Sequence, residues 1–405
     1  MNSLEKNNIP AGYKDSAVGI IPQEWDVKRV KDLGSVITGS TPPTADVSNY
    51  GSEYMFVSPA DLSDNQKYVL STEKMLSTKG YAISRKMPKG TILYTCIGST
   101  IGKIGIASRE LTSNQQINAV ICNDKTEYLY YALLFTTGRI KMLAGEQAVP
   151  IINKSEFENI KLSVPPLAEQ RKIAEILGAW DEAIEKQSRL IEKLELRKRA
   201  LMQRLLTGRT RLPGFTTPWQ KVKLGEIFKE RNETKCEHLP LLSITADRGV
   251  ILQSESDKKD TSNDDKSKYK RICPNDIGYN TMRMWQGRSA LSAMEGIVSP
   301  AYTIVTPKVE VDPLFISELI KQPRVVYDFW THSQGLVGDT LNCKFHDFSQ
   351  VKVAIPSHPE QKAIAKVLTA ADNEIATHRK KLDALRLQKR GLMQQLLTGK
   401  TRVKI

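Results

Sequence analysis

The sequence predicts an α+β fold: two globular segments with substantial β-sheet, separated by two long antiparallel coiled-coil helices related by pseudo-two-fold symmetry. Three observations support this prediction. The 47 residues at 165–211 recur at 356–402, exactly one gap-free shift of 191 positions along the chain. Both copies carry a seven-residue apolar period, and both follow globular segments that begin with a similar pattern. A long internal repeat of this kind sets the architecture of a chain.

Each copy of the repeat is expected to form one long helix. The first copy begins with prolines at 165 and 166, and the second begins with a proline-containing segment at 356–359. Proline is favoured at the first helical position because its missing N–H needs no partner there. Both copies end in Leu-Leu-Thr-Gly, and Gly208 and Gly399 are typical of the position just past a helix end. A helix of about 37 residues spans roughly 55 Å, which suits a spacer. The alternative for a single helix of this kind is a core or dimerisation helix.

The apolar residues of both copies keep the heptad spacing of a coiled coil over about four to five repeats. Two seam positions are polar in both copies, Gln187 with His378 and Lys198 with Lys389, which suggests that these residues fix the register. The predicted seam, the row of residues along which the two helices pack, consists of Ile173, Leu177, Trp180, Ile184, Gln187, Ile191, Leu194, Leu201, Ile364, Leu368, Ala371, Ile375, His378, Leu382, Leu385 and Leu392.

The charge distribution favours antiparallel pairing of the two helices. Acidic residues gather in the first half of each helix and basic residues in the second half. Parallel helices would place like charges opposite one another, whereas antiparallel helices place acids opposite bases. If Gln187 and His378 lie near the middle, Lys389 falls opposite Trp180 and Lys198 falls opposite Ala371.

Composition favours a protein that binds a polyanion. The net charge is +14 and the pI is near 9.4, which suits DNA or RNA as a partner, although many unrelated proteins are equally basic. The five cysteines are scattered without a C-x-x-C pair, a usage typical of a reducing compartment without disulfides or structural zinc. No signal peptide and no apolar run of about 18 residues is evident. We therefore expect a soluble, cytoplasmic protein.

The two globular segments begin alike, at Trp25 and Trp219, and each leads into one long helix. This organisation gives five predicted parts: an N-terminal arm at 1–22, a first domain at 23–164, a first helix at 165–211, a second domain at 212–355 and a second helix at 356–405.

Each domain is predicted to contain several strands. The first domain has strand patterns at 90–97, 105–108 and 116–121, and helical spacing from Tyr128 to Leu143. In the second domain, residues 275–279 stand where 90–94 stood, and 299–305 stand where 114–120 stood. The two helical segments are much more alike in sequence than the two domains are. This contrast suggests that the helices meet a constant partner and that the domains meet different targets.

Motifs for catalysis are missing. The segment Gly98–Lys103 resembles a phosphate-binding P-loop, but only three residues separate its glycines, and Ile104 stands where Ser or Thr would bind magnesium. The segment at 299–302, Ser-Pro-Ala-Tyr, resembles the Pro-Pro-aromatic turn of amino-methyltransferases, but its second proline is alanine. The histidines are dispersed without metal-ligand spacing. We therefore expect no catalytic residue, no metal and no cofactor in this chain.

Both copies open with Pro-x-x-x-Glu-Gln or a close variant and end with Leu-Met-Gln-(Arg/Gln)-Leu-Leu-Thr-Gly-(Arg/Lys)-Thr-Arg. These segments resemble the helical regions of type I restriction–modification specificity subunits, the HsdS family. The entry segment Gly19-Ile-Ile-Pro-x-x-Trp25 and the turn that begins at Gly39 resemble the same family. The resemblance covers nearly the whole chain. Two departures are the 356–359 segment, which lacks Pro-Pro, and the segment at 212–215, which replaces Gly-x-Ile-Pro before Trp219.

The resemblance implies a non-catalytic subunit that confers DNA sequence specificity. Each globular segment would be a target-recognition domain for one half of a split asymmetric site in double-stranded DNA, and the antiparallel helices would set the spacer. The helices would also dock two methylation subunits, and restriction subunits would complete the nuclease. Adenosylmethionine, ATP and magnesium would belong to these partners.

DNA contacts require Lys and Arg for phosphates, and Arg, Lys, Asn or Gln for base edges. Our candidates in the first domain are Ser40, Thr41, Arg85, Lys86, Lys89 and Lys103. Those in the second domain are Lys266, Lys268, Lys270, Arg283, Trp285, Gln286 and Arg288.

Two alternative functions stay open. A stand-alone methyltransferase with degenerate motifs would bind adenosylmethionine without a partner. A coiled-coil protein that binds nucleic acid without sequence specificity would show a steep salt dependence and no sequence preference. Neither alternative explains divergent domains on duplicated helices.

Overall fold

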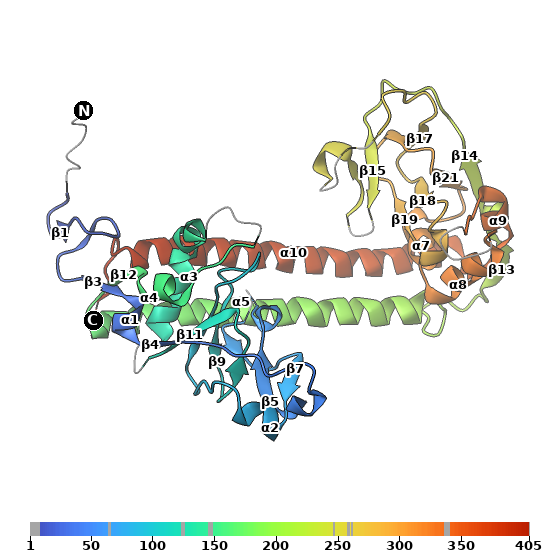
Figure 1. Cartoon of the computed structure of the whole chain (residues 1–405). Coiled ribbons are helices and arrows are strands. Elements are labelled where there is room, and N and C mark those ends of the chain that lie inside the picture. The colour runs from blue at the N-terminus through green and yellow to red at the C-terminus, as the bar shows by residue number, and fades with distance from the viewer. Residues whose placement is uncertain are drawn as a thin grey trace. The chain divides into compact units, whose positions relative to one another are not determined.

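The computed structural model describes residues 9–63, 66–122, 126–144, 149–245, 248–256, 260, 262–335 and 341–404. It contains two compact units (Figure 1). The first unit combines Met1–Leu190 with His378–Ile405, and the second is Ile191–Thr377. The boundary between them falls within both long helices, so each unit contains part of each helix.

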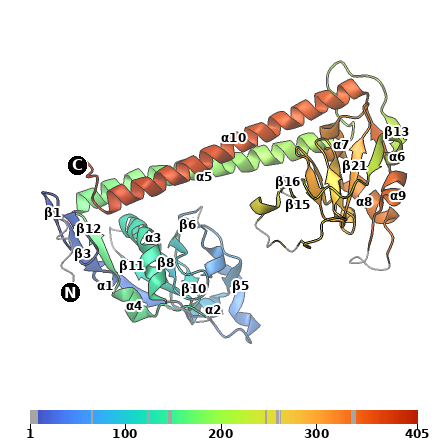
Figure 2. The same ribbon diagram turned by 90° about the horizontal axis from the view of Figure 1, so that it is seen from above.

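The long helices are α5, Leu167–Leu205, and α10, His358–Leu397. In the first unit, the beginning of α5 lies beside the end of α10 (Figure 2). There Lys389 Nζ lies 2.5 Å from Asp181 Oδ1, and Gln187 Nε2 donates to the His378 carbonyl at 2.9 Å. In the second unit the helices exchange roles, because Lys198 Nζ donates to Asp372 Oδ1 at 2.7 Å. The predicted antiparallel pairing is therefore confirmed.

The predicted register of the coiled coil also agrees with these contacts. Gln187 faces His378, Lys389 lies beside the residue after Trp180, and Lys198 lies beside the residue after Ala371. The apolar seam positions are buried or partly buried along both helices.

The helix ends follow the local sequence. Gly208 and Gly399 follow the last turns with φ of 68° and 71°, a left-handed conformation that glycine adopts without strain. At position 399 glycine is also required for space, since a Cβ there would lie 2.4 Å from the Pro22 ring. The chain therefore ends each long helix with the residue that the sequence pattern indicated.

The first unit is built on a five-stranded sheet in the order β4-β11-β8-β9-β6. Smaller pairings join β3 with β12, β1 with β2, and β5 with β7 and β10. The strands are β1 Tyr13–Lys14, β2 Ile21–Pro22, β3 Asp26–Arg29, β4 Ser35–Thr38, β5 Tyr50–Val57, β6 Tyr68–Val69, β7 Lys74–Leu76, β8 Ile92–Thr95, β9 Ile104–Ala107, β10 Thr112–Ser113, β11 Ile117–Ile121 and β12 Lys161–Val164.

Helix α3, Thr126–Leu143, connects this sheet to the long helices. One core cluster contains Tyr94 and Val120 from the sheet, Leu133 from α3, and Ile173 and Leu177 from α5. The shorter helices of the unit are α1 Val30–Leu33, α2 Thr78–Ala82 and α4 Lys154–Glu158. The five-stranded sheet and the long helices of this unit therefore share one hydrophobic core.

The second unit repeats this plan with a four-stranded sheet in the order β14-β21-β18-β19. Its other pairings are β13 with β22, β15 with β16, and β17 with β20. The strands are β13 Gln220–Lys223, β14 Phe228–Arg231, β15 Leu242–Thr245, β16 Gly249–Leu252, β17 Lys270–Ile272, β18 Ile277–Asn280, β19 Ser289–Leu291, β20 Gly296–Val298, β21 Tyr302–Pro307 and β22 Lys352–Ile355. The helices are α6 Leu224–Ile227, α7 Pro313–Leu319, α8 Pro323–His332 and α9 Phe345–Gln350.

Four strands of the first sheet correspond to the second sheet, since β4, β11, β8 and β9 have the same order and antiparallel pairings as β14, β21, β18 and β19. The edge strand β6 has no counterpart in the described part of the second sheet. The strands predicted at 90–97, 105–108 and 116–121 are present as β8, β9 and β11. Strand β21 begins at Tyr302, whose N–H closes a turn onto the Ser299 carbonyl at 3.0 Å.

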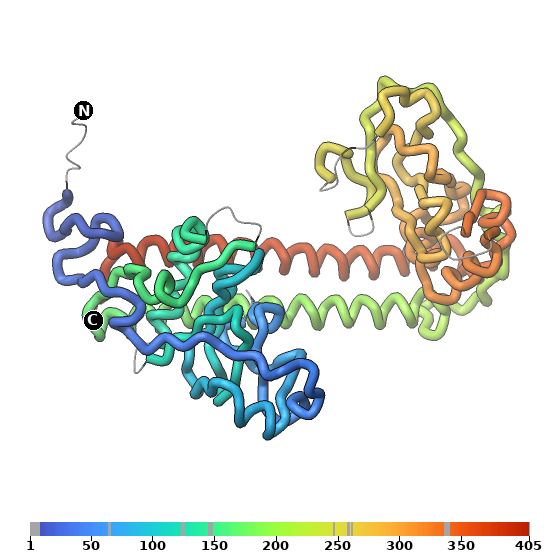
Figure 3. Tube along the Cα trace, viewed as in Figure 1, coloured from blue at the N-terminus to red at the C-terminus, as the bar shows by residue number. Residues whose placement is uncertain are grey.

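In each unit, a buried glutamate at the start of one long helix binds an arginine that follows the other long helix. In the first unit the Glu169 carboxylate accepts hydrogen bonds from Arg402 at 2.8 and 3.0 Å, and from Trp25 Nε1 at 3.0 Å. Tyr13 also donates to the Gly399 carbonyl at 2.8 Å. Figure 3 shows the resulting approach of the blue N-terminal segment to the red end of α10. The ends of the described chain therefore meet in this unit.

Within the described part of the chain, no helix combines the length and apolar character needed to cross a membrane.

Candidate nucleic-acid interface

Three of the first-domain candidates lie together at the end of β4. Ser40 Oγ accepts a hydrogen bond from the Arg85 backbone N–H at 3.0 Å, and Arg85 Nη1 donates to the Thr38 carbonyl at 2.7 Å. Thr41 is exposed and donates from its hydroxyl to the Gln115 side-chain oxygen. The fold thus joins residues from two distant parts of the sequence on one exposed surface.

The contact with Gln115 reveals residues that sequence reasoning missed. Asn114, Gln115 and Gln116 immediately precede β11, and the Asn114 amide donates to Gln116 Oε1 at 2.9 Å. Strand register explains their position, because Asn118 of β11 pairs with Thr38 of β4. Asn and Gln amides can recognise base edges through paired hydrogen bonds. Three consecutive amide side chains between two strands were the available sequence signal.

Lys86 extends this surface across a pair of aromatic rings. Its Nζ lies 4.9 Å from the centre of the Tyr81 ring. The Tyr81 ring in turn stacks on Tyr54 with centres 3.9 Å apart and planes 9° apart. Burial, reinforced by the neighbouring Glu110 carboxylate, raises the pKa of Tyr81 to about 12. The Tyr81 hydroxyl therefore remains neutral beside the exposed Lys86 side chain.

The other two first-domain candidates make no described contact with this surface. Lys103 is partly buried, and its Nζ donates to the Pro59 carbonyl at 3.1 Å. Lys89 is exposed in the turn before β8. The structure therefore does not join these two lysines to the Ser40 cluster through any described contact.

Four second-domain candidates share the loop between β18 and β19. The short 3₁₀ helix Met284–Gln286 shapes this loop, and Gly287 ends it with φ of 72°. Arg283, Gln286 and Arg288 are exposed, whereas Trp285 is partly buried and donates from Nε1 to the Met282 carbonyl at 2.9 Å. Two arginines and one amide are thus presented on a single ordered loop.

The three lysine candidates lie before and on β17. Lys268 is exposed, and Lys266 Nζ donates to the Asn263 carbonyl at 3.2 Å. Lys270 lines a cleft of about 680 Å³. The cleft also contains Lys344 and His346, which sequence reasoning missed because α9 lies more than 70 residues further along the chain. Its full lining is Glu230, Lys270, Thr281, Met282, Pro300, Ala301, Thr303, Asn342, Lys344, Phe345, His346 and Ser349.

The turns that precede β11 and β21 occupy corresponding places in the two units, whereas the β18–β19 loop corresponds to the β8–β9 loop that contains Lys103. Pro300 and Ala301 immediately precede β21, as Gln115 and Gln116 precede β11. The first unit therefore presents amides where the second presents an apolar turn beside lysines. Both arrangements supply donors for phosphate and base contacts. Among the described residues, no group of three or more His, Cys, Asp or Glu side chains is arranged to hold a metal ion.

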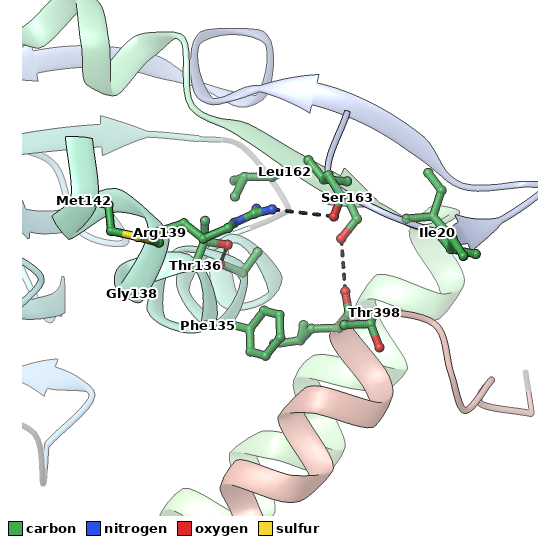
Figure 4. Close-up of a pocket in the computed structure, with 13 residues that line it drawn as sticks. Ile20, Phe135, Thr136, Gly138, Arg139, Met142, Leu162, Ser163 and Thr398 are labelled. Carbon is green, nitrogen blue, oxygen red and sulfur yellow. Dashed lines mark hydrogen bonds between the residues drawn. The ribbon is translucent and has the colours of Figure 1, made fainter. Parts of the chain in front are cut away.

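An apolar pocket of about 400 Å³ in the first unit has a different character (Figure 4). It lies between α3, β12 and the end of α10, and Phe135, Met142 and Leu162 contribute to its wall. Ser163 Oγ donates to the Leu397 carbonyl at 3.0 Å across this site. Arg139 Nη1 approaches the Val18 carbonyl at 3.5 Å. Its lining is too apolar to suit a phosphate backbone.

Comparison with known proteins identifies related chains. Residues 22–196 and 314–387 match the type I restriction modification DNA specificity domain. The MjaVIII type I restriction enzyme specificity subunit of Methanocaldococcus jannaschii is 25% identical over 95% of this chain and 94% of its own length. The MjaIX specificity subunit of the same organism is 35% identical over 45% of each chain. This chain therefore spans less than half of the second relative.

Two solved structures share the fold. A crystal structure of the type I restriction–modification S subunit from M. genitalium matches with a TM-score of 0.57 and 16% identity, over 97% of this chain and 98% of that chain. A chain from a study of the assembly and conformational transition of the type I R-M system matches with a TM-score of 0.58 and 16% identity. That match covers 94% of this chain and 99% of the other.

Proposed function

Because the chain belongs to the type I restriction–modification DNA specificity family, we propose that it directs a type I complex to a split asymmetric DNA site. Each recognition domain, at 23–164 and 212–355, contacts one half of the site. The coiled coil sets the number of unspecified base pairs between the halves. The observation that carries the proposal is the repetition of one sheet plan with different surface loops, since equal scaffolds with unequal contact residues suit two unequal half-sites.

The first recognition domain is proposed to contact DNA through Arg85, Thr41 and the amides at 114–116. Arg85 supplies bidentate donors that suit guanine or a phosphate, and Gln115 or Gln116 suits adenine. Ser40 holds the Arg85 backbone in place, which reduces the freedom that DNA binding would otherwise have to restrict. Lys86, Lys89 and Lys103 are proposed to contact phosphates. On binding DNA, Lys103 would exchange its hydrogen bond to the Pro59 carbonyl for one to a phosphate.

The second recognition domain is proposed to use the loop between β18 and β19. Arg283, Gln286 and Arg288 are its candidates for base contacts, and Trp285 fixes the loop by bonding its backbone. Lys266, Lys268 and Lys270 are proposed as phosphate contacts. Phosphate contacts position a protein on the duplex without reading its sequence, whereas base contacts carry the specificity.

The partners follow from the same proposal. The repeated helices are proposed to bind two methylation subunits through a shared surface, and restriction subunits join the full complex. Methyl transfer and DNA cleavage would then take place on those subunits, which would bind adenosylmethionine, ATP and magnesium. This chain would supply no catalytic residue. The duplicated helix sequence supports this proposal because one kind of partner can then bind twice.

The test is co-expression with the methylation subunits of the same host, followed by sequencing of methylated adenines in genomic DNA. We expect one split motif with a constant gap. Arg85→Ala should relax or weaken recognition of one half-site and Arg288→Ala that of the other, each by about 1–3 kcal/mol. Lys221→Ala, an exposed charge on β13, is the matched control.

Two results would contradict the proposal. Methylation without sequence preference, together with a steep salt dependence, would indicate non-specific nucleic-acid binding. Binding of adenosylmethionine by the purified chain alone would indicate a methyltransferase. Equal loss of affinity for all DNA in Arg288→Ala would reduce Arg288 to a phosphate contact.

A further inference from the structure

The first recognition domain contacts the coiled coil through a buried tyrosine. Tyr131 of α3 is fully buried, and its hydroxyl donates to Asp181 Oδ2 of α5. The other oxygen of Asp181 lies 2.5 Å from Lys389 Nζ of α10. The same ammonium lies 5.3 Å from the centre of the Tyr131 ring. One tyrosine of the recognition domain therefore touches both long helices.

A second set of contacts links this tyrosine to the sheet of the domain. Lys67, just before β6, is paired with Glu127 of α3, and its Nζ also approaches Tyr131 Oη at 3.5 Å. Tyr68 of β6 donates from its hydroxyl to the same Glu127 carboxylate. Lys67 Nζ further lies 5.4 Å from the centre of the Tyr131 ring. The edge strand β6, α3, α5 and α10 are thus joined in one polar network.

Burial, reinforced by the Asp181 charge, raises the pKa of Tyr131 well above its usual range. The hydroxyl therefore stays protonated and remains a donor to Asp181 under ordinary conditions. A hydrogen bond to a charged group is among the stronger polar contacts in a protein.

The equivalent ion pair in the second unit is more exposed than the pair beside Tyr131. Asp372 and Lys198 occupy the positions of Asp181 and Lys389 in the repeat. The Asp372 side chain is 54% exposed, whereas the Asp181 side chain is 24% exposed. Among the contacts of the described residues, Asp372 receives a hydrogen bond from Lys198 and none from the second recognition domain. In the second unit, this ion pair therefore links the two long helices and makes no described hydrogen bond to the recognition domain.

The helix sequence matches this difference. Position 178 of α5 is glycine. A Cβ added there would lie 3.8 Å from Tyr131 Oη and 3.9 Å from Lys67 Nζ. The corresponding position of α10 is Thr369, whose larger side chain would reach further toward such a tyrosine. The first helix therefore leaves room for the network, whereas the repeat sequence of the second helix is bulkier at this position.

The contact adds a second anchor to the first domain. The first anchor is Glu169, bound by Trp25 and Arg402 at the start of α5. Asp181 lies 12 residues later, which is about 18 Å along the helix. Two anchors separated by this distance fix the direction of a rigid domain along the helix, whereas a single anchor permits it to rock.

We propose that Tyr131, held by Lys67, is a positioning residue that fixes the angle of the first recognition domain on the coiled coil and thereby makes the gap between the two half-sites strict. The inference rests on the proposed function. Tyr131 contacts no DNA and acts through the placement of the surface that contains Arg85 and Gln115. Among the described residues, the second domain makes no equivalent hydrogen bond to Asp372, and its backbone instead bonds α10 through Asp312 and Gln361.

The test selects randomised duplex DNA with the complex of this chain and its methylation subunits, and counts the gap lengths of the recovered sites. Tyr131→Phe removes the hydroxyl that donates to Asp181 while retaining the ring. Lys67→Met removes the ammonium group that contacts the Tyr131 hydroxyl and ring. We expect both half-site sequences to stay unchanged while discrimination against gaps one base pair longer or shorter falls about tenfold. Tyr94→Phe is the matched control, because its buried hydroxyl bonds Thr137 inside the domain.

Two outcomes would overturn the inference, and a third would restrict the positioning role to Tyr131 alone. The gap could stay strict in Tyr131→Phe while affinity for every site falls in parallel, which would show a purely structural role. Tyr94→Phe could broaden the gap as much, which would show general loosening of the domain. Lys67→Met could leave the gap unchanged while Tyr131→Phe broadens it, which would remove the lysine from the proposal. Failure of the proposed function itself is distinct, since the unaltered complex would then select no split site.

Discussion

Each unit contains an equivalent buried ion pair at the ends of its long helices. The tryptophan beside this pair, however, makes different contacts in the two units. Glu169 with Arg402 in the first unit and Glu360 with Arg211 in the second occupy equivalent positions of the repeat, and both carboxylates are fully buried. Trp25 Nε1 donates to Glu169 at 3.0 Å. Trp219 Nε1 has no hydrogen-bond partner among the described residues, and its ring instead meets Phe315 edge-on at 6.2 Å.

The units also differ in how the chain reaches these pairs. Arg211 and Trp219 are eight residues apart on one connecting segment. Arg402 and Trp25 lie near opposite ends of the chain and meet only in the folded state. Beyond its glutamate, Arg402 bonds Glu24 at 2.8 Å and Arg211 bonds the Thr217 carbonyl at 2.8 Å. The first unit adds the hydrogen bonds from Trp25 to Glu169 and from Tyr13 to the Gly399 carbonyl. A junction without covalent continuity is therefore held by additional polar contacts.

The largest expected effect comes from removing the arginines. Arg211→Ala leaves the buried Glu360 carboxylate without its described partner, and a loss of about 3–5 kcal/mol is typical of a broken buried pair. Arg402→Ala should cost less, because Glu169 retains the Trp25 N–H. Denaturant unfolding of both variants measures the difference. Equal losses would mean that the Trp25 hydrogen bond contributes nothing to the junction.

The tryptophans provide a sharper comparison with smaller effects. Trp25→Phe removes a donor to a buried carboxylate and should destabilise the protein by about 1.5–3 kcal/mol, beyond the loss of ring area. Trp219→Phe removes a buried N–H that has no described partner, so its cost should be limited to lost packing. Thermal unfolding of the pair tests this order. A larger loss in Trp219→Phe would show that its N–H is satisfied after all.

The smallest expected effect concerns acid sensitivity. The hydrogen bond from Arg402 lowers the pKa of Glu24 below its usual value of 4.5. A carboxyl with a lowered folded pKa contributes stability above its unfolded pKa and loses it as the pH falls below that value. Glu24→Gln should therefore slightly flatten the dependence of Tm on pH below about pH 5, where Glu24 titrates in the unfolded chain. An unchanged slope would show that solvent screens this contact fully.

The sequence predicted the long helices well because their signals are local and periodic. The heptad rows, the helix-ending glycines and the segregation of acids from bases all lie within one repeat, and together they gave the antiparallel pairing. Gln187 opposite His378 followed from the same pattern. The strands at β8, β9 and β11 were also found.

The candidate DNA surfaces were predicted only in part. Arg283, Gln286 and Arg288 lie on one loop, so their proximity was visible in the sequence. Gln115 was missed because strand pairing, rather than sequence distance, brings it to Thr41. Lys344 and His346 were missed for the same reason, since their helix reaches the Lys270 cleft only in the folded domain.

The sequence by itself determined the duplicated helices, their direction and the repeated order of domain and helix. Tertiary structure decided which side chains meet at the recognition surfaces and how each domain is attached to the coiled coil. Tyr131 and Asp181 are 50 residues apart, and their identities alone do not indicate a contact. The physical reason is that helical periodicity is set by neighbouring residues, whereas such contacts depend on strand register and on the packing of α3 against both long helices.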